Sequence, residues 1–209
     1  MIKEVYLIRH SKPLKVNNDK NMDSLQIQNE KQPLSIEGEN IAREKLNIEE
    51  LKDIDKLYSS SYVRAISTAK YIAENNNIEI NVINDFGERK FGINSWDELP
   101  DNFGEKQFLD ENFKTVGGES QKDVRERTFN ALMNVLKSDD KKIAIVFHGT
   151  AMLFLLMTWC KVVPDSDKYK IFFNGNELLW GKHFDFCETF KLTFDDENKL
   201  INIENIKHD

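Results

Sequence analysis

Two apolar runs in the sequence each end in a histidine that a small residue follows. The first is VYLIRHS (residues 5–11) and the second is IAIVFHGT (residues 143–150). In open α/β sheets, ligands bind in the crevice beyond the carboxyl ends of the strands. If both runs form parallel strands of one sheet, His10 and His148 lie at the same edge of it.

Three further polar residues lie at or near the ends of strand-like runs. Arg9 directly precedes the first histidine, Arg64 comes about one helical turn after the run KLY (residues 56–58), and Glu88 follows the next apolar run. Each of these alone has an ordinary structural explanation. As a set of two cations, two imidazoles and one acid, they require an anion, because buried cations without a partner are costly. A phosphoryl group fits, since arginine presents a planar fork of donors to its oxygens.

The elements that would position these residues alternate between strands and helices. The pattern predicts strands at residues 5–8, 56–58, 78–83 and 143–147. Apolar residues at helical spacing predict three helices, at residues 63–73, at 124–135 with Ser120 as a cap, and from a Ser35 cap to about Leu46. This alternation is typical of an α/β layered domain with a largely parallel sheet.

Four segments fall outside this alternation. Residues 17–32 are polar and predict an exposed loop, and residues 86–118 predict an inserted loop or lid over a site. Residues 151–160 are too few to span a membrane and predict a buried core helix. Residues 177–205 alternate at period two, which predicts antiparallel strands with a turn at residues 195–199. We therefore expect a single domain over residues 1–209 with the insert at about 86–118.

Composition limits the partners of the chain. A net charge of −7 argues against a nucleic-acid or anionic-membrane surface, and leaves room for a small anionic substrate in a local positive pocket. Cys160 and Cys187 form no disulfide framework and show no metal spacing. Charged residues follow the N-terminus at once, unlike a signal peptide. We expect a cytoplasmic protein without metal or cofactor.

The same residues, taken with their neighbours, resemble the histidine phosphatase superfamily, which includes the cofactor-dependent phosphoglycerate mutases. LIRHS is similar to the family's Arg-His-Gly signature, and VFHGTAM to its second His-Gly. PLSIEGENIA, YSSSYVRAISTA, FGERKFG and VGGESQKDVRERT resemble four further motifs of the family, in order. The resemblance extends from residue 5 to residue 152 and implies a three-layer α/β/α sandwich with a mostly parallel central sheet, as in the mutases.

The resemblance also implies a mechanism. His10 would be the nucleophile that carries a phosphohistidine until water removes the group, and Arg9 and Arg64 would lower its pKa by charge repulsion. Arg9, Arg64 and His148 would hold the equatorial oxygens of the phosphoryl group. Glu88 would be the general acid for the leaving alkoxide and then the base for water. No metal is required, since the arginines supply the positive charge.

Departures from the mutase pattern favour a phosphatase acting on a small phosphomonoester. Ser11 stands where the family usually has glycine and would narrow the space beside the nucleophile, while Val16 stands where the mutases have asparagine, unless a one-residue slip places Asn17 there. Trp96 lacks the glycine that commonly follows it. A cofactor-dependent phosphoglycerate mutase, a non-catalytic phospho-ligand binding protein and a metallohydrolase on His10, Glu88 and His148 are the alternatives.

Two sets of side chains near the predicted site bear on the substrate. Four basic residues could add positive charge around the site: Lys12, Lys15, Arg89 and Lys90. Such charge would favour an acidic or doubly phosphorylated substrate. A lining for the substrate, or lid packing, could come from Phe91, Trp96, Phe103 and Phe108. His183 and His208 belong to no motif, and SSS (residues 59–61) lacks the elbow of a serine hydrolase.

Overall fold

The apolar run at residues 5–8 forms the middle of β1 (Lys3–Arg9), an interior strand of a six-stranded sheet. The structure is a computed structural model that describes residues 2–16, 24–165, 168–181 and 183–208. Strand β1 is parallel to β4 (Lys142–Phe147) on one side and antiparallel to β8 (Thr189–Phe194) on the other. Both of its faces are covered, which is why its sequence is continuously apolar rather than alternating.

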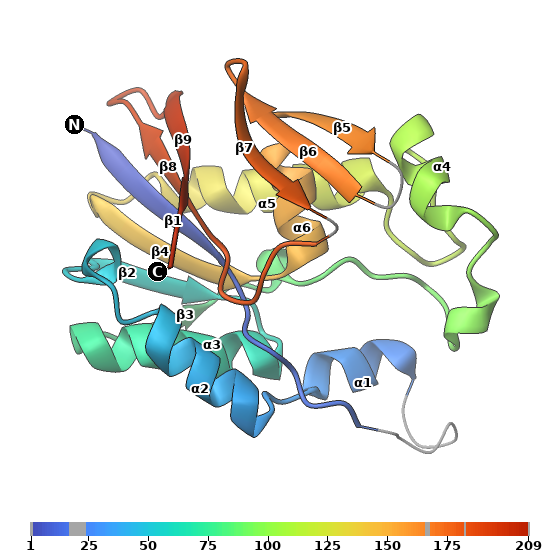
Figure 1. Cartoon of the computed structure of the whole chain (residues 1–209), viewed down its shortest axis with the longest axis horizontal. Coiled ribbons are helices and arrows are strands. Elements are labelled where there is room, and N and C mark those ends of the chain that lie inside the picture. The colour runs from blue at the N-terminus through green and yellow to red at the C-terminus, as the bar shows by residue number, and fades with distance from the viewer. Residues whose placement is uncertain (1, 17–23, 166–167, 182, 209) are drawn as a thin grey trace.

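The strand order of this sheet is β3-β2-β4-β1-β8-β9 (Figure 1). Strands β2 (Lys56–Ser59) and β3 (Ile80–Val82) continue the parallel part, and β9 (Leu200–Ile206) pairs antiparallel with β8. The four strands predicted from the sequence are therefore all present and mutually parallel, although β3 is shorter than predicted. Their carboxyl ends share one edge of the sheet.

Helices cover both faces of the sheet (Figure 1). They are α2 (Ile36–Lys45) and α3 (Val63–Asn76) on one face, and α5 (Gln121–Val135) and α6 (Gly149–Leu156) on the other. Successive side chains of β1 point to opposite faces, so that Val5 and Leu7 pack in the cluster with α5 and α6, whereas Tyr6 and Ile8 pack with α2 and α3. The predicted three-layer arrangement is confirmed.

Both predicted helix caps are present. The side chain of Ser35 accepts a hydrogen bond from the Gly38 amide (3.0 Å) at the start of α2. At the start of α5, Ser120 accepts from the Asp123 amide (3.1 Å), and the Asp123 carboxylate accepts from the Ser120 amide (2.9 Å), which forms a capping box. These caps fix where the two helices begin relative to the sheet edge.

The predicted core helix at residues 151–160 is largely correct. Its first six residues, 151–156, are all buried and lie within α6, which ends at Leu156. Within the described part of the chain, no helix is long and apolar enough to cross a lipid bilayer.

A second, three-stranded antiparallel sheet follows α6. It consists of β5 (Lys161–Asp165), β6 (Lys168–Phe173) and β7 (Asn176–Gly181). The sequence correctly predicts antiparallel strands over residues 177–205 and the turn between β8 and β9, but β5 and β6 were not predicted, and β7 pairs with β6 rather than with β8. Pro164 interrupts the β5 pattern, which is tolerated because β5 is an edge strand.

Two polar segments differ in outcome. The predicted loop at 17–32 contains a short helix, α1 (Leu25–Lys31), capped by Ser24; the part at 17–23 lies outside the described residues. None of the seven residues of α1 is fully buried, so the helix has no apolar face that a sequence pattern could reveal. Residues 86–118 are mostly irregular, as expected, and include one helix of seven residues, α4 (Phe103–Leu109).

Gly38, in the first turn of α2, lies directly against the segment that follows His10. A Cβ atom at this position would lie 2.1 Å from the backbone oxygen of Lys12, which also accepts hydrogen bonds from Ser35. We expect Gly38→Ala to lower the free energy of unfolding by about 1–3 kcal/mol through overpacking, as measured by equilibrium urea denaturation.

The matched control for this change is Gly104→Ala. Gly104 is also helical, in α4, and nothing lies within 4 Å of a Cβ atom built there. Alanine should therefore raise stability by up to about 1 kcal/mol through helix propensity alone. Equal effects of the two substitutions would contradict the close contact at Gly38.

Candidate active site

His10 lies immediately after β1 and is 5% exposed. Its Nδ1 atom is 2.7 Å from the backbone oxygen of Ser11. A carbonyl oxygen can only accept, so Nδ1 carries the hydrogen and Nε2 carries the lone pair. Burial lowers the pKa of His10 well below 6.5, and the charges of Arg64 and Arg9 lower it further. The ring is therefore neutral, with a nucleophilic nitrogen at Nε2.

Arg64 reaches both imidazoles from the first turn of α3. Its Nε donates to His10 Nε2 (3.0 Å), and its Nη2 lies 3.1 Å from His148 Nδ1. The guanidinium also stacks on the ring of Tyr62, with 4.9 Å to the ring centroid. Arg64 is only 3% exposed, so its positive charge is held inside the protein beside two neutral rings.

His148 comes directly after β4 and precedes α6. Its Nδ1 accepts from Arg64, because a guanidinium has no acceptor atom, and its Nε2–H therefore donates to Ser60 Oγ (2.8 Å). The centroids of the His10 and His148 rings are 5.1 Å apart. Burial is again the main cause that lowers the pKa of His148, followed by the charge of Arg64.

Arg9 supplies a buried donor that has no partner in the described part of the chain. Its Nη1 donates to the backbone oxygen of Phe184, and its guanidinium lies 4.8 Å from the centroid of the Phe186 ring, but its Nε–H is buried and unpaired. A Cβ atom at Gly149 would lie 3.4 Å from this Nε, so glycine keeps the space beside it open. A buried unpaired N–H on a cation is a strong site for an oxyanion.

Glu88 is held against the first turn of α6. Its carboxylate accepts from the backbone amides of Arg89 (2.9 Å), Ala151 (3.1 Å) and, more weakly, Thr150 (3.4 Å). The same helix follows His148, so α6 positions the carboxylate relative to the second histidine.

A cavity of about 650 Å³ opens over these residues. Arg9, His10 and Glu88 line it directly, whereas Arg64 and His148 are not lining residues and contact His10. The rest of the lining comes from α4, α6, the second sheet and residues 183–184. The structure thus brings all five predicted site residues together, three in the cavity lining and two in contact with His10.

Ser11 does not narrow the cavity, contrary to the expectation from the sequence. Its hydroxyl donates to the backbone oxygen of Gly38 (2.7 Å) and its amide donates to Thr68 Oγ1 (2.9 Å), so the residue is tied to α2 and α3. Ser11 is fully buried and is not part of the cavity lining.

The four basic residues proposed to add charge around the site do not line the cavity. Lys12 forms an exposed ion pair with Glu37 (2.5 Å). Arg89 is buried, with its guanidinium 4.6 Å from the centroid of the Phe103 ring and 5.5 Å from that of Phe91. Neither Lys15 nor Lys90 is a lining residue. The structure therefore removes the support that these residues gave to an acidic or doubly phosphorylated substrate.

Of the four aromatic residues suggested as a substrate lining, Phe108 alone is among the described lining residues. Phe91 packs against Trp96 (5.1 Å between centroids) and Phe103 (5.9 Å), so these three form lid packing around Arg89.

Sequence reasoning missed several polar residues of the site, among them Ser60 and His183. Ser60, in the SSS segment, bonds His148, and His183 lines the cavity. The signal for Ser60 was its place within a family-like motif, whereas His183 gave no signal because it reaches the cavity only through the unpredicted second sheet. No group of three His, Cys, Asp or Glu side chains among the described residues is arranged to hold a metal ion.

Comparison with known proteins identifies the family. The mycobacterial glucosyl-3-phosphoglycerate phosphatase is 17% identical with a TM-score of 0.70, and the match covers 98% of this chain and 97% of that one. YhfR of Bacillus stearothermophilus is 19% identical with a TM-score of 0.67, covering 99% and 98%. A histidine-to-alanine variant of phosphoserine phosphatase from Entamoeba histolytica, in complex with phosphoserine, is 19% identical with a TM-score of 0.62, covering 97% and 96%.

At these identities the similarity of the structures shows the fold. No curated protein matches the sequence. The family itself is shown by a match to the histidine phosphatase superfamily (branch 1) over residues 5–175, most of the chain. The chain therefore belongs to branch 1 of the histidine phosphatase superfamily.

Proposed function

We propose that the protein is a phosphomonoesterase that hydrolyses a small phosphorylated metabolite through a phosphohistidine on His10. The observation that carries the proposal is the unpaired, buried Nε–H of Arg9 beside the neutral, nucleophilic imidazole of His10. A phosphoryl group satisfies both, because it offers an oxygen to the donor and phosphorus to the lone pair. The phosphatase names of two structural neighbours agree with this chemistry.

In the first step, His10 Nε2 attacks phosphorus, the N–P bond forms and the ester P–O bond breaks. Arg64 Nε–H, which donates to that lone pair in this structure, turns to a phosphoryl oxygen instead. Arg9 and His148 bind the other oxygens, where negative charge develops. His148 can do so because the Ser60 hydroxyl can donate to Nε2 as well as accept from it, which lets the ring carry its hydrogen at Nδ1.

Glu88 is the proton donor and then the proton acceptor. The protonated carboxyl gives its hydrogen to the departing alkoxide, which leaves as the alcohol. The resulting carboxylate then takes a proton from water as the water oxygen attacks phosphorus. The N–P bond breaks, inorganic phosphate forms and His10 is restored as the neutral base. The amides at the start of α6 hold the carboxylate in place for both transfers.

A phosphoglycerate mutase would need a second anion site in the cavity to hold the substrate carboxylate. Among the described lining residues, the permanent positive charges are Arg9, which we assign to the phosphoryl group, and Lys168, which is exposed. This favours the phosphatase over the mutase.

The proposal is tested with a panel of phosphomonoesters, assayed for released phosphate at mildly acidic to neutral pH with a chelator present. We expect hydrolysis of at least one ester at an unchanged rate with the chelator. Loss of activity on chelation would support a metallohydrolase instead. Isomerisation of phosphoglycerate in the presence of a bisphosphoglycerate primer would support the mutase, and the absence of all turnover would support a non-catalytic binder.

Glu88→Gln provides a specific test of the acid. For an alkyl phosphate, whose alcohol is a poor leaving group, we expect kcat to fall by about a hundredfold. For nitrophenyl phosphate the loss should be only a few-fold, because nitrophenolate leaves without needing a proton. Steady-state kinetics on both esters measure the difference, and equal losses would remove Glu88 from the acid role.

A further inference from the structure

We infer that the leaving group of the substrate is a bulky apolar alcohol, such as one that carries an aromatic ring, rather than a sugar or a carboxylated alcohol. This inference rests on the proposed function and specifies its substrate class. It follows from the side chains that line the cavity beyond the catalytic residues. We call five of these the apolar wall: Phe108, Leu153, Phe154, Tyr169 and Phe184.

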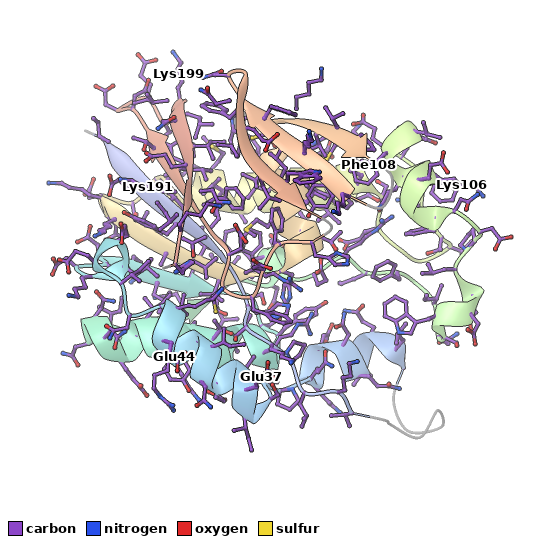
Figure 2. All side chains as sticks on the ribbon, viewed as in Figure 1. Glu37, Glu44, Lys106, Phe108, Lys191 and Lys199 are labelled. Atoms are coloured by element: carbon purple, nitrogen blue, oxygen red, sulfur yellow. The ribbon has the colours of Figure 1, made fainter. Side chains whose placement is uncertain are left out.

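The apolar wall is built from four separate parts of the chain. Phe108 comes from α4, on the side of that helix turned toward β5, whereas Lys106 points away (Figure 2). Leu153 and Phe154 come from α6, and Tyr169 comes from β6. Phe184 follows the second sheet. The inserted segment and the second sheet therefore both contribute apolar side chains to the lining of one cavity.

The wall is rigid on the side of the second sheet. Phe184 is 2% exposed, and its ring packs edge-on against Phe190 (5.3 Å between centroids) and Tyr169 (6.1 Å). Its backbone oxygen accepts from Arg9, so this part of the wall is fixed directly to the phosphate-facing arginine. A leaving group attached to a phosphoryl group on Arg9 would therefore contact these rings.

The polar side chains of the lining are mostly committed or exposed. Gln107 accepts from the Arg89 guanidinium through its side-chain oxygen. Lys168 is exposed, and its Nζ lies 4.6 Å from the centroid of the Trp180 ring. Glu105 is exposed and negative, so it would repel an acidic substrate. Thr150 remains as a polar group that can offer a hydrogen bond, and His183 also lies in the lining.

Burying a second charge of the substrate against the apolar wall would cost binding free energy. Burying an apolar group there would instead contribute about 25 cal/mol of binding free energy for each Å² removed from water. The cavity volume of about 650 Å³ lies within the range of sites that enclose small organic ligands. We therefore expect kcat/KM for benzyl phosphate to exceed that for 3-phosphoglycerate by at least about tenfold, which is the discrimination that hydrophobic pockets provide.

The variant that tests the wall is Phe108→Ala. It should lower kcat/KM for benzyl phosphate roughly tenfold and change that for ethyl phosphate less than twofold, because an ethyl group has much less apolar surface to bury against the ring. Phe108→Leu should retain most of the preference. The matched control is Phe129→Ala, since Phe129 is likewise partly buried against the same core cluster but is not a lining residue. Phe129→Ala should leave the ratio of kcat/KM for benzyl phosphate to kcat/KM for ethyl phosphate unchanged.

Binding of phosphonates separates this inference from the proposed function. Benzylphosphonate and ethylphosphonate keep the phosphoryl charge but cannot be hydrolysed, and calorimetry measures their affinities for the wild-type chain. We expect benzylphosphonate to bind at least about tenfold more tightly. If benzylphosphonate binds tightly but no ester is hydrolysed, the assignment as a phosphatase is wrong and the apolar site is retained. Hydrolysis with 3-phosphoglycerate preferred, or a Phe129→Ala effect equal to that of Phe108→Ala, would overturn the apolar site and retain the phosphatase.

Discussion

Replacing His10 with alanine is expected to lower kcat for phosphomonoester hydrolysis by about 10⁴-fold or more, since the change removes the atom that bonds to phosphorus. The lone pair on His10 Nε2 is available because Nδ1–H is bound to the backbone oxygen of Ser11 and because burial and two arginines keep the ring neutral. His148, the imidazole beside His10, is hydrogen-bonded at both nitrogens and so has no free lone pair to replace it. Initial rates with an activated aryl phosphate measure the loss.

The phosphohistidine gives this prediction a second, independent measurement. Wild-type chain mixed briefly with substrate and quenched in base should carry an acid-labile phosphoryl group on the peptide that contains His10, detected by mass spectrometry. His10→Ala should carry none. The control is His208→Ala, which removes a partly buried histidine bound to Lys45 and Thr189 rather than to the site. A label elsewhere in the chain, or turnover by His10→Ala near the wild-type rate, would contradict the assignment.

Arg64→Met should lower kcat/KM by roughly a thousandfold, at the upper end of what removal of one transition-state donor costs. The side chain is suited to this role because a single guanidinium contacts both His10 and His148 and carries its charge in a buried position. Methionine fills similar volume without charge or donor. Far-UV circular dichroism and a thermal melt confirm that the variant is folded before its kinetics are interpreted.

The same substitution should also change the pH profile. Burial is the largest cause that lowers the pKa of His10, and the charge of Arg64 is the next. Without that charge the pKa rises toward 6.5, so the ring becomes protonated, and loses its lone pair, at a higher pH than in the wild type. The acid limb of kcat/KM should therefore move to higher pH in Arg64→Met. In Arg64→Lys, which keeps the charge but not the fork, the limb should stay while kcat/KM still falls.

The parallel core of the fold was predictable from the sequence because its signals are local. Runs such as residues 143–147 are buried on both faces and read as continuous apolar strands, and Ser35 and Ser120 mark helix starts by their caps. The short helix α1 and the strands β5 and β6 were not predictable. A helix that buries no residue has no apolar period, and Pro164 disguises the edge strand β5, which pairs with β6.

The candidate site also has a part that the sequence predicts and a part that it does not. The five site residues all lie at or beyond the carboxyl ends of strands in the parallel sheet, so the topology of open α/β sheets places them at one edge. The apolar wall could not be predicted, because Phe108, Tyr169 and Phe184 come together only through the packing of α4 and the second sheet. Arg89 shows why a basic residue next to Glu88 in the sequence need not add positive charge to the cavity. Its guanidinium packs against the rings of Phe91 and Phe103 instead.

The strand order has a consequence for the synthesis of the protein. Strand β1 is translated long before its two neighbours in the sheet, β4 and β8, which follow it by more than a hundred residues. The His10 amide donates to the Phe147 oxygen and the Arg9 amide to the Glu188 oxygen, so the nucleophile stays unanchored until both have been translated. A nascent chain that ends before β8 already contains all five site residues but cannot close the sheet around them. Activity should therefore appear only after β8 has been translated.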